Sequence, residues 1–277
     1  MIKLLDEPDE NTYQVIRQKI WTFGIEALPP LEKAWENSFN PLIQDRIQEI
    51  TRQLRRDNSY TDFVNWARLG SPDLLKGFIL VTKTQYPDLI ETEILAKVEQ
   101  IRMDVWLELH ENLTALENVK VLNHILFGVH LFDGNKINTT APQNSYINTL
   151  LESHQGSPLS LGMLYVIIAQ KLGLPVYGVN LPQHFILAYL LDIGLPNPSE
   201  EDVLFYINPF NKGAVFTRRE IELFIRQMKI KPDRSFFAPC THLDIIKRLI
   251  HNLIFSYDKL GYADKIDDLE NLLSAIE

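Results

Sequence analysis

The chain of 277 residues is long enough for a substantial core, and its 45% hydrophobic and 23% charged residues are ordinary for a globular protein. Its net charge of −9 argues against non-specific binding to nucleic acid or to anionic membranes, because neither polyanion gains from an acidic partner. The single cysteine, Cys240, excludes an intrachain disulfide and a cysteine-based zinc site. No apolar run approaches the roughly 20 residues that span a bilayer, and the N-terminal stretch MIKLLDEPDE is acidic where a signal peptide is apolar. We therefore expect a cytoplasmic protein that binds neither nucleic acid nor a membrane.

Residues 1–110 show the apolar spacing of amphipathic helices. Pro41 should divide the stretch LEKAWENSFNPLIQDRIQEITRQLRRD into two helices, because its ring disrupts the preceding turn. Further helices are expected over residues 60–67, 74–84 and 91–108. The start LPPLEKAW resembles a HEAT-type helical hairpin, although one or two such units are too few to indicate a solenoid.

A second region, residues 111–235, combines one buried helix with short strands. The stretch LSLGMLYVIIAQKLG is apolar nearly all round, so residues 159–172 should form the most buried helix of the chain. Runs rich in β-branched and aromatic residues predict three strands, over residues 176–180, 184–190 and 204–208, paired as one antiparallel sheet on that helix. This pattern is typical of an α+β core inside a largely helical chain.

The last region, residues 236–277, predicts a C-terminal helical hairpin. Two helical apolar faces flank Gly261, which suits the turn between antiparallel helices. We expect this hairpin to pack on the core or on residues 216–230.

Three features of the second region fall in the places that papain-like nucleophilic catalysis requires. Pro158 to Ser160 start the buried helix, His184 begins one strand and Asn208 ends the next. In such enzymes a helix N-terminus lowers the pKa of a cysteine, a histidine accepts its proton, and a third group orients the imidazole.

Sequence motifs in the same order resemble the SirB-type transglutaminase-like family. They are NHILFGVHLFDGN, the long stretch APQNSYINTLLESHQGSPLSLGMLYVIIAQKLGLPVYGVNLPQHFILAYL, and YINPFNKG. The resemblance covers roughly residues 115–277 and implies a papain/transglutaminase-like core joined to tetratricopeptide-like C-terminal helices.

The catalytic residues of that family carry over only in part. The nucleophilic cysteine would lie within residues 157–160, and no cysteine is there. The family histidine maps onto His184 and the family aspartate onto Asn208, a substitution that papain-like enzymes tolerate. Cys240 lies in a separate stretch, FFAPC, ahead of a C-terminal helix and does not replace the missing thiol. The resemblance therefore implies a degenerate, inactive triad at Ser160, His184 and Asn208.

Each candidate also has a purely structural interpretation. His184 would then be a buried histidine bonded to backbone groups and to Asn208, and Ser160 would cap the first turn of its helix. Asn144, Ser145 and Asn148 would tie down a loop. The histidines show no metal-ligand spacing, so we expect neither a metal nor another cofactor.

The sequence thus favours a non-catalytic transglutaminase-like protein that acts as a binding or regulatory module for another protein or a peptide. One alternative is a serine-dependent hydrolase or acyltransferase that uses Ser160, His184 and Asn208. That alternative is weakened because GSPLSLG lacks the Gly-x-Ser-x-Gly elbow that usually exposes such a serine. Another alternative is a helical protein-interaction scaffold in which the core is only a spacer.

Overall fold

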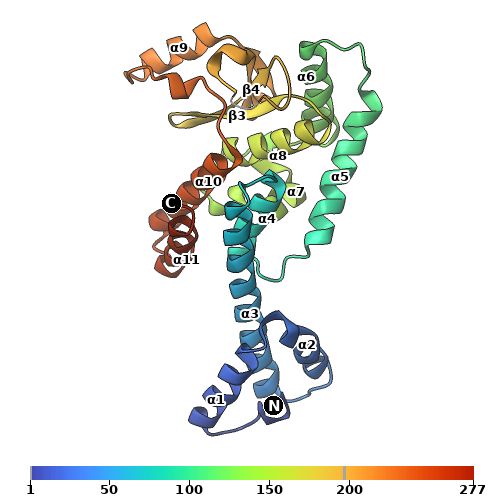
Figure 1. Cartoon of the computed structure of the whole chain (residues 1–277), viewed down its shortest axis with the longest axis vertical. Coiled ribbons are helices and arrows are strands. Elements are labelled where there is room, and N and C mark those ends of the chain that lie inside the picture. Colours follow the sequence, from blue (N-terminus) through green and yellow to red (C-terminus); the bar gives the residue numbers. More distant parts are fainter. Residues whose placement is uncertain (1, 196–197) are drawn as a thin grey trace.

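The computed structural model describes residues 2–195 and 198–277. A small N-terminal lobe projects from a larger body, and one long helix, α3, runs from the lobe into the body (Figure 1). Within the body, helix α9 covers one face of a sheet and helix α8 covers the other, so the three form layers (Figure 1).

Helices make up most of the lobe and of the body, and the strands of the main sheet lie between α8 and α9 in the chain. The bounds of the helices are α1 (Glu10–Trp21), α2 (Leu28–Glu36), α3 (Pro41–Arg68), α4 (Leu74–Gln85), α5 (Glu91–Glu108), α6 (Ala115–Asn123), α7 (Ile147–Ser153), α8 (Pro158–Lys171), α9 (Arg218–Gln227), α10 (His242–Leu260) and α11 (Ala263–Ser274). A π-helical turn, His124–Val129, extends α6.

The main sheet has four antiparallel strands in the order β3-β4-β5-β6. Its strands are β3 (Val176–Leu181), β4 (His184–Leu190), β5 (Val203–Asn208) and β6 (Ala214–Phe216). A two-stranded parallel pair, β1 (Asp133–Gly134) and β2 (Gln155–Gly156), lies apart from it. The predicted α+β fold, with strands β3, β4 and β5 in one antiparallel sheet on the buried helix, is confirmed. The short strand β6 was not predicted.

Helix α8 is the buried centre of the body. Ser157 and Ser160 form a capping box at its start, and every residue from Leu159 to Ala169 is buried. The prediction for residues 159–172 is therefore confirmed. A helix that is apolar on all sides has no face to give to solvent, so elements must pack around all of it.

Helix α3 is continuous over 28 residues. Pro41 occupies its first turn and Asn40 caps it, so the predicted break before Pro41 is confirmed. The separate helix predicted for residues 60–67 is wrong, because these residues continue the same helix. The intervening stretch RRDNSYTD is polar but contains neither proline nor glycine, so nothing in it ends a helix.

The two ends of α3 belong to different apolar clusters. Its first half packs with α1 and α2 through Ile47, Ile50 and Leu54. Its second half contributes Phe63 and Trp66 to the cluster that contains α8. The first half of α3 thus packs in the N-terminal lobe and the second half packs in the body. The predicted domain boundary at residue 110 stays a prediction.

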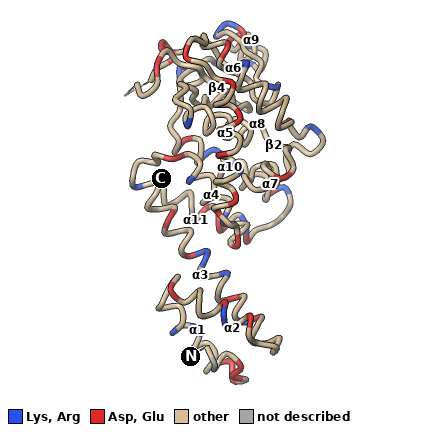
Figure 2. Tube along the Cα trace, turned by 90° about the vertical axis from the view of Figure 1, so that its right-hand side faces the viewer, with Lys and Arg blue, Asp and Glu red and all other residues tan. Residues whose placement is uncertain are grey.

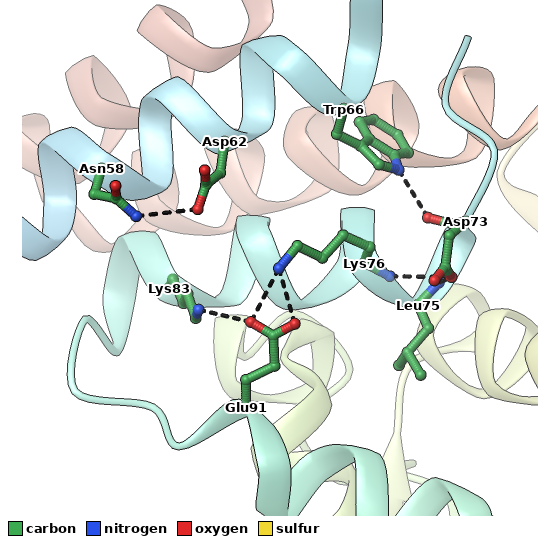
Figure 3. A network of polar contacts seen from close by, with 8 residues as sticks. All are labelled: Asn58, Asp62, Trp66, Asp73, Leu75, Lys76, Lys83 and Glu91. Carbon is green, nitrogen blue, oxygen red and sulfur yellow. Dashed lines mark hydrogen bonds and ion pairs between the residues drawn. The ribbon is translucent and has the colours of Figure 1, made fainter. Parts of the chain in front are cut away.

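Polar contacts join the C-terminal part of α3 to the start of α4, and α4 to α5 (Figure 3). The indole Nε1 of Trp66 donates to the carbonyl of Asp73, whose carboxylate caps α4. Glu91, at the start of α5, accepts from Lys76 and Lys83 of α4 at 2.8 and 2.9 Å. Burial alone would raise the pKa of Glu91, but these two ammonium groups outweigh it and hold the pKa below its usual value.

The C-terminal helices form the expected hairpin. Gly261, with a φ of +74°, ends α10 and begins the turn into α11. Helix α10 buries a row of side chains in the central cluster: Ile245, Ile246, Leu249, Ile250, Leu253 and Tyr257. Among the residues that the structure describes, no helix is both long and apolar enough to cross a membrane.

Candidate functional site

Strand β4 presents alternate side chains to opposite layers. Phe185 and Leu187 face α8 and belong to the central cluster. Ile186 belongs to the cluster beneath α9. Because side chains alternate along a strand, His184 points with Ile186 toward α9 and away from α8.

The imidazole of His184 packs on an aromatic ring. Its centroid lies 4.8 Å from that of Phe224 in α9, in an edge-to-face arrangement. The side chain remains exposed along one side, and no hydrogen bond from its ring nitrogens to a described residue is present. Partial burial, followed by the nearby Arg248, lowers the pKa of His184, so the ring is neutral at pH 7.

The backbone of His184 is held by a residue that the motif analysis missed. Arg248, in α10, donates from Nη2 to the His184 carbonyl at 2.8 Å and from Nη1 to the Leu181 carbonyl at 3.0 Å. These bonds close the two-residue turn, Pro182–Gln183, between β3 and β4. Arg248 lies 64 residues from His184 in the chain, so no local pattern relates the two.

Ser160 is fully buried on the other side of the sheet. Its Oγ donates to the Asn144 carbonyl at 2.6 Å and accepts from the Ser157 N–H at 2.9 Å. Ser157, not Ser160, is the N-cap of α8, while Ser160 is its capping-box partner. Ser160 thus takes part in capping the helix, as expected, but from the third helical position and not from the N-cap position itself.

Asn208 lies at the end of β5 on the same face as His184. Leu187 pairs with Ile207, so the next residue, Asn208, projects to the opposite face from both. Its side-chain oxygen accepts from the N–H groups of Phe210 and Asn211 and caps the short helix η6 (Pro209–Asn211). Asn208 therefore lines the same cavity as His184, but its side-chain oxygen is already hydrogen-bonded within its own loop.

This cavity, which we call the His184 cavity, has a volume of about 220 Å³. It lies between the outer face of the sheet and α9, and is lined by Leu181, His184, Ile186, Asn208, Phe216, Glu220, Ile221 and Phe224. Its polar groups are the imidazole, the Asn208 amide and the Glu220 carboxylate. The Glu220 pKa is lowered by bonds from the Thr217 backbone and hydroxyl, so the carboxylate is ionised.

Other residues of the quoted motifs hold the loops around α8 in place. Asn123 donates from Nδ2 to the Gly213 carbonyl and accepts from the Tyr165 hydroxyl. A Cβ at Gly213, whose φ is +72°, would lie 1.8 Å from the Asn123 oxygen, so only glycine fits there.

Asn144 behaves as the loop residue that was predicted. It donates to the Asn138 carbonyl and accepts from the Asn135 amide, and its own carbonyl receives Ser160. Ser145 is buried in the same short helical turn as Asn144. The structure records no hydrogen bond for the buried Oδ1 of Asn148 within its described residues.

Cys240 does not have the properties of a reactive thiol. Burial raises its pKa to about 12, which keeps it protonated. Its N–H donates to the Gly178 carbonyl of β3, which anchors the chain before α10. Within residues 2–195 and 198–277, no three His, Cys, Asp or Glu side chains gather as metal ligands would.

A sequence profile described as "Transglutaminase-like superfamily" matches residues 92–251, which include α8, the whole main sheet and the motifs above. The chain belongs to the transglutaminase-like superfamily. The match begins at α5 and ends within α10, so the family core includes both the helix that carries Ser160 and the strand that carries His184.

Curated relatives fall into two groups. A UPF0162 protein of Xylella fastidiosa is 27% identical over 216 residues, which cover 72% of this chain and 72% of the relative. Human F-box only protein 21 is 29% identical over 152 residues, which cover 55% of this chain and 23% of that protein. A UPF0162 protein of Vibrio cholerae is 30% identical over 94 residues, or 34% of this chain and 32% of the relative. No solved structure matches.

Proposed function

We propose that this member of the transglutaminase-like superfamily is not an enzyme and acts as a binding or regulatory module. The observation that carries the proposal is the separation of Ser160 from His184 by the sheet. Ser160 is buried with its Oγ bonded to Ser157 and Asn144, while the imidazole lies under α9. A serine hydroxyl needs a general base within hydrogen-bond reach to become a nucleophile.

Phe185 supports the same conclusion, because it occupies the place on β4 that faces α8. Its ring fills the space beside Gly162, at the second turn of the helix. A base that served a nucleophile at residue 160 would have to project from this face of the strand.

The proposed binding surface is the His184 cavity. At about 220 Å³ it is smaller than the roughly 300–1,000 Å³ typical of small-molecule pockets. A single side chain of a protein or peptide partner suits it better. Phe216 and Phe224 offer apolar walls, and the neutral imidazole of His184 offers a hydrogen-bond donor and an acceptor.

The helical ends complete the proposal. We propose that residues 1–110 form a HEAT-like interaction region and that residues 236–277 form a tetratricopeptide-like hairpin, as in the SirB-type family, on either side of the core at 111–235. The exposed aromatic side chains of Trp35, in the last turn of α2, and of Phe39, between α2 and α3, support an interaction role for the lobe.

Chemical labelling tests the absence of catalysis. We expect a serine-directed fluorophosphonate probe to leave Ser160 of the native protein unmodified. A second arm uses Ser160→Cys and iodoacetamide, with the partly buried thiol of Cys240, whose pKa is raised, as an internal control. We expect the new thiol to react as slowly as Cys240. Labelling at residue 160 that is lost in His184→Ala would favour the hydrolase or acyltransferase alternative and overturn the proposal.

Peptide selection tests the binding role. Peptides displayed on phage and enriched on the wild-type protein should lose binding to Phe224→Ala, which removes one wall of the cavity. They should retain binding to Phe255→Ala, which removes an aromatic ring 54% exposed on α10. Equal loss in both variants would place the binding surface elsewhere, as the scaffold alternative predicts.

A further inference from the structure

A second cavity, of about 500 Å³, lies where α3 meets the α4–α5 turn, the start of α7 and the first turn of α11. It is separate from the His184 cavity and shares no lining residue with it. We call it the cationic cavity, because Arg52, Arg56 and Lys265 line it. Figure 2 shows Lys and Arg positions along the middle of α3, near α11.

The charge of this cavity opposes that of the whole chain. Its lining holds three cationic side chains and one carboxylate, Asp88. That carboxylate is already engaged by Arg55, which also contacts Glu32 at 2.7 Å. The lining therefore has a formal charge of +2 in a protein whose net charge is −9.

The three cations are poorly neutralised by the protein. Among the described residues, neither Arg52 nor Lys265 has a carboxylate within 4.0 Å of its side-chain nitrogens. Arg56 reaches Asp268 only at 3.8 Å, and its Nε is buried with no hydrogen-bond partner in the described chain. Burial and then the charge of Arg56 lower the pKa of Lys265, although Asp268 and Asp264 act in the opposite sense.

Clustered cations of this kind repel one another, and an anion bound between them offsets that repulsion. We propose that the cationic cavity binds the phosphate group of a small phosphorylated molecule. A phosphate monoester carries a charge of about −1.5 to −2 at pH 7, which matches the charge of the lining. Guanidinium groups such as those of Arg52 and Arg56 match the phosphate oxygens in geometry as well as in charge.

The volume and the remaining lining indicate a ligand larger than phosphate alone. A cavity of about 500 Å³ lies within the range of small-molecule sites. Tyr86 and Leu89 give one wall apolar surface for the body of the molecule. The side-chain amide of Asn148, whose oxygen has no described hydrogen-bond partner, can turn its NH₂ group toward an anion.

Calorimetry with defined probes tests this proposal on the full chain. The probes are inorganic phosphate, ribose 5-phosphate and ribose, all at one ionic strength. We expect both phosphates to bind, the sugar phosphate more tightly, and ribose not to bind. Arg52→Gln and Lys265→Gln should each weaken binding roughly tenfold or more, because each removes a charged hydrogen-bond donor.

Lys97→Gln is the matched control, since it removes one exposed positive charge on α5, outside the lining. It should leave the affinity for ribose 5-phosphate unchanged. Equal weakening in all three variants would mean that only the net charge of the protein matters, and would overturn the proposal. Binding of a phosphoserine peptide without binding of ribose 5-phosphate would overturn the assignment to a small molecule. Absence of binding to every phosphate would overturn the site itself.

Discussion

The ring of Phe185 lies against Gly162, so closely that a Cβ on residue 162 would stand 2.6 Å from the Cδ1 and Cε1 atoms of the ring. The same ring meets Gly178 of β3, where a Cβ would lie 2.6 Å from Cζ. The two glycines thus make room for one aromatic side chain between α8 and the sheet. This packing brings β4 close to the helix, with Phe185 rather than His184 at the point of closest approach.

Gly162→Ala should destabilise the protein even though alanine favours helix. The added methyl group must displace a ring that is enclosed on two sides, and overpacking of this kind costs about 1–3 kcal/mol. Alanine stabilises a helix by only ~1 kcal/mol relative to glycine, so the steric cost should dominate. Urea unfolding followed by circular dichroism measures the change. Gly162→Ala combined with Phe185→Leu should recover part of the loss, and an unchanged free energy of unfolding in Gly162→Ala would contradict this packing.

Ser160→Ala should lower the free energy of unfolding by about 1–3 kcal/mol. The substitution removes the Ser160 hydroxyl as a donor to the Asn144 carbonyl and as an acceptor for the Ser157 N–H, so in this buried region these two groups keep only their bond to each other at 3.1 Å. Ser153→Ala is the matched control, because that hydroxyl is exposed and bonds only to nearby backbone groups. Its effect should stay within about 0.5 kcal/mol. A neutral Ser160→Ala would remove the structural role assigned here to this serine.

Gln183→Gly should stabilise the protein. Gln183 has a φ of +59° in the turn between β3 and β4, in the left-handed region that glycine adopts without steric cost. The relief of about 1–2 kcal/mol exceeds the cost of the flexibility that glycine adds to the unfolded chain, for a net gain of roughly 0.5–1 kcal/mol. Thermal unfolding gives the comparison. Gln143→Gly, at an exposed position with ordinary φ, should lower the melting temperature instead.

His184 should make stability depend on pH below 6.5. Its pKa in the folded protein lies below the ordinary value of 6.5, so between the two pKa values the unfolded chain binds more protons. The contribution of neutral His184 to stability is therefore present above pH 6.5 and is lost as the pH falls through the folded-state pKa. The free energy of unfolding measured from pH 5 to pH 7.5 should fall less steeply on acidification in His184→Gln than in the wild type. Identical slopes would mean that the imidazole titrates freely.

The sequence predicts the layered core well because α8 and the strands carry strong and independent signals. An all-round apolar stretch between Pro158 and Gly173 leaves little choice but a buried helix. The continuity of α3 was missed because short apolar matches on either side of a polar stretch look like two helices. Strand β6, three residues long, is too short for alternation to register.

The direction of His184 could not be predicted, for a different reason. Strand β4 is covered by α8 on one face and by α9 on the other, and all of its residues after His184 are buried. A strand that is apolar on both faces shows no alternation, so its sequence does not reveal which residues face which layer. The bond from Arg248 depends on a helix far along the chain, and local motifs contain no information about it.

Helix α3 fixes the angle of the N-terminal lobe as well as its distance from the body. Each residue of an α-helix advances the chain by about 1.5 Å and turns it by about 100°. Inserting one residue between Leu54 and Phe63 would therefore swing α1 and α2 about a quarter-turn around the helix axis while moving them outward hardly at all. Four inserted residues would bring the lobe almost back to its original orientation about the helix axis. The length of the polar stretch between these two residues thus sets the direction in which the lobe points from the body.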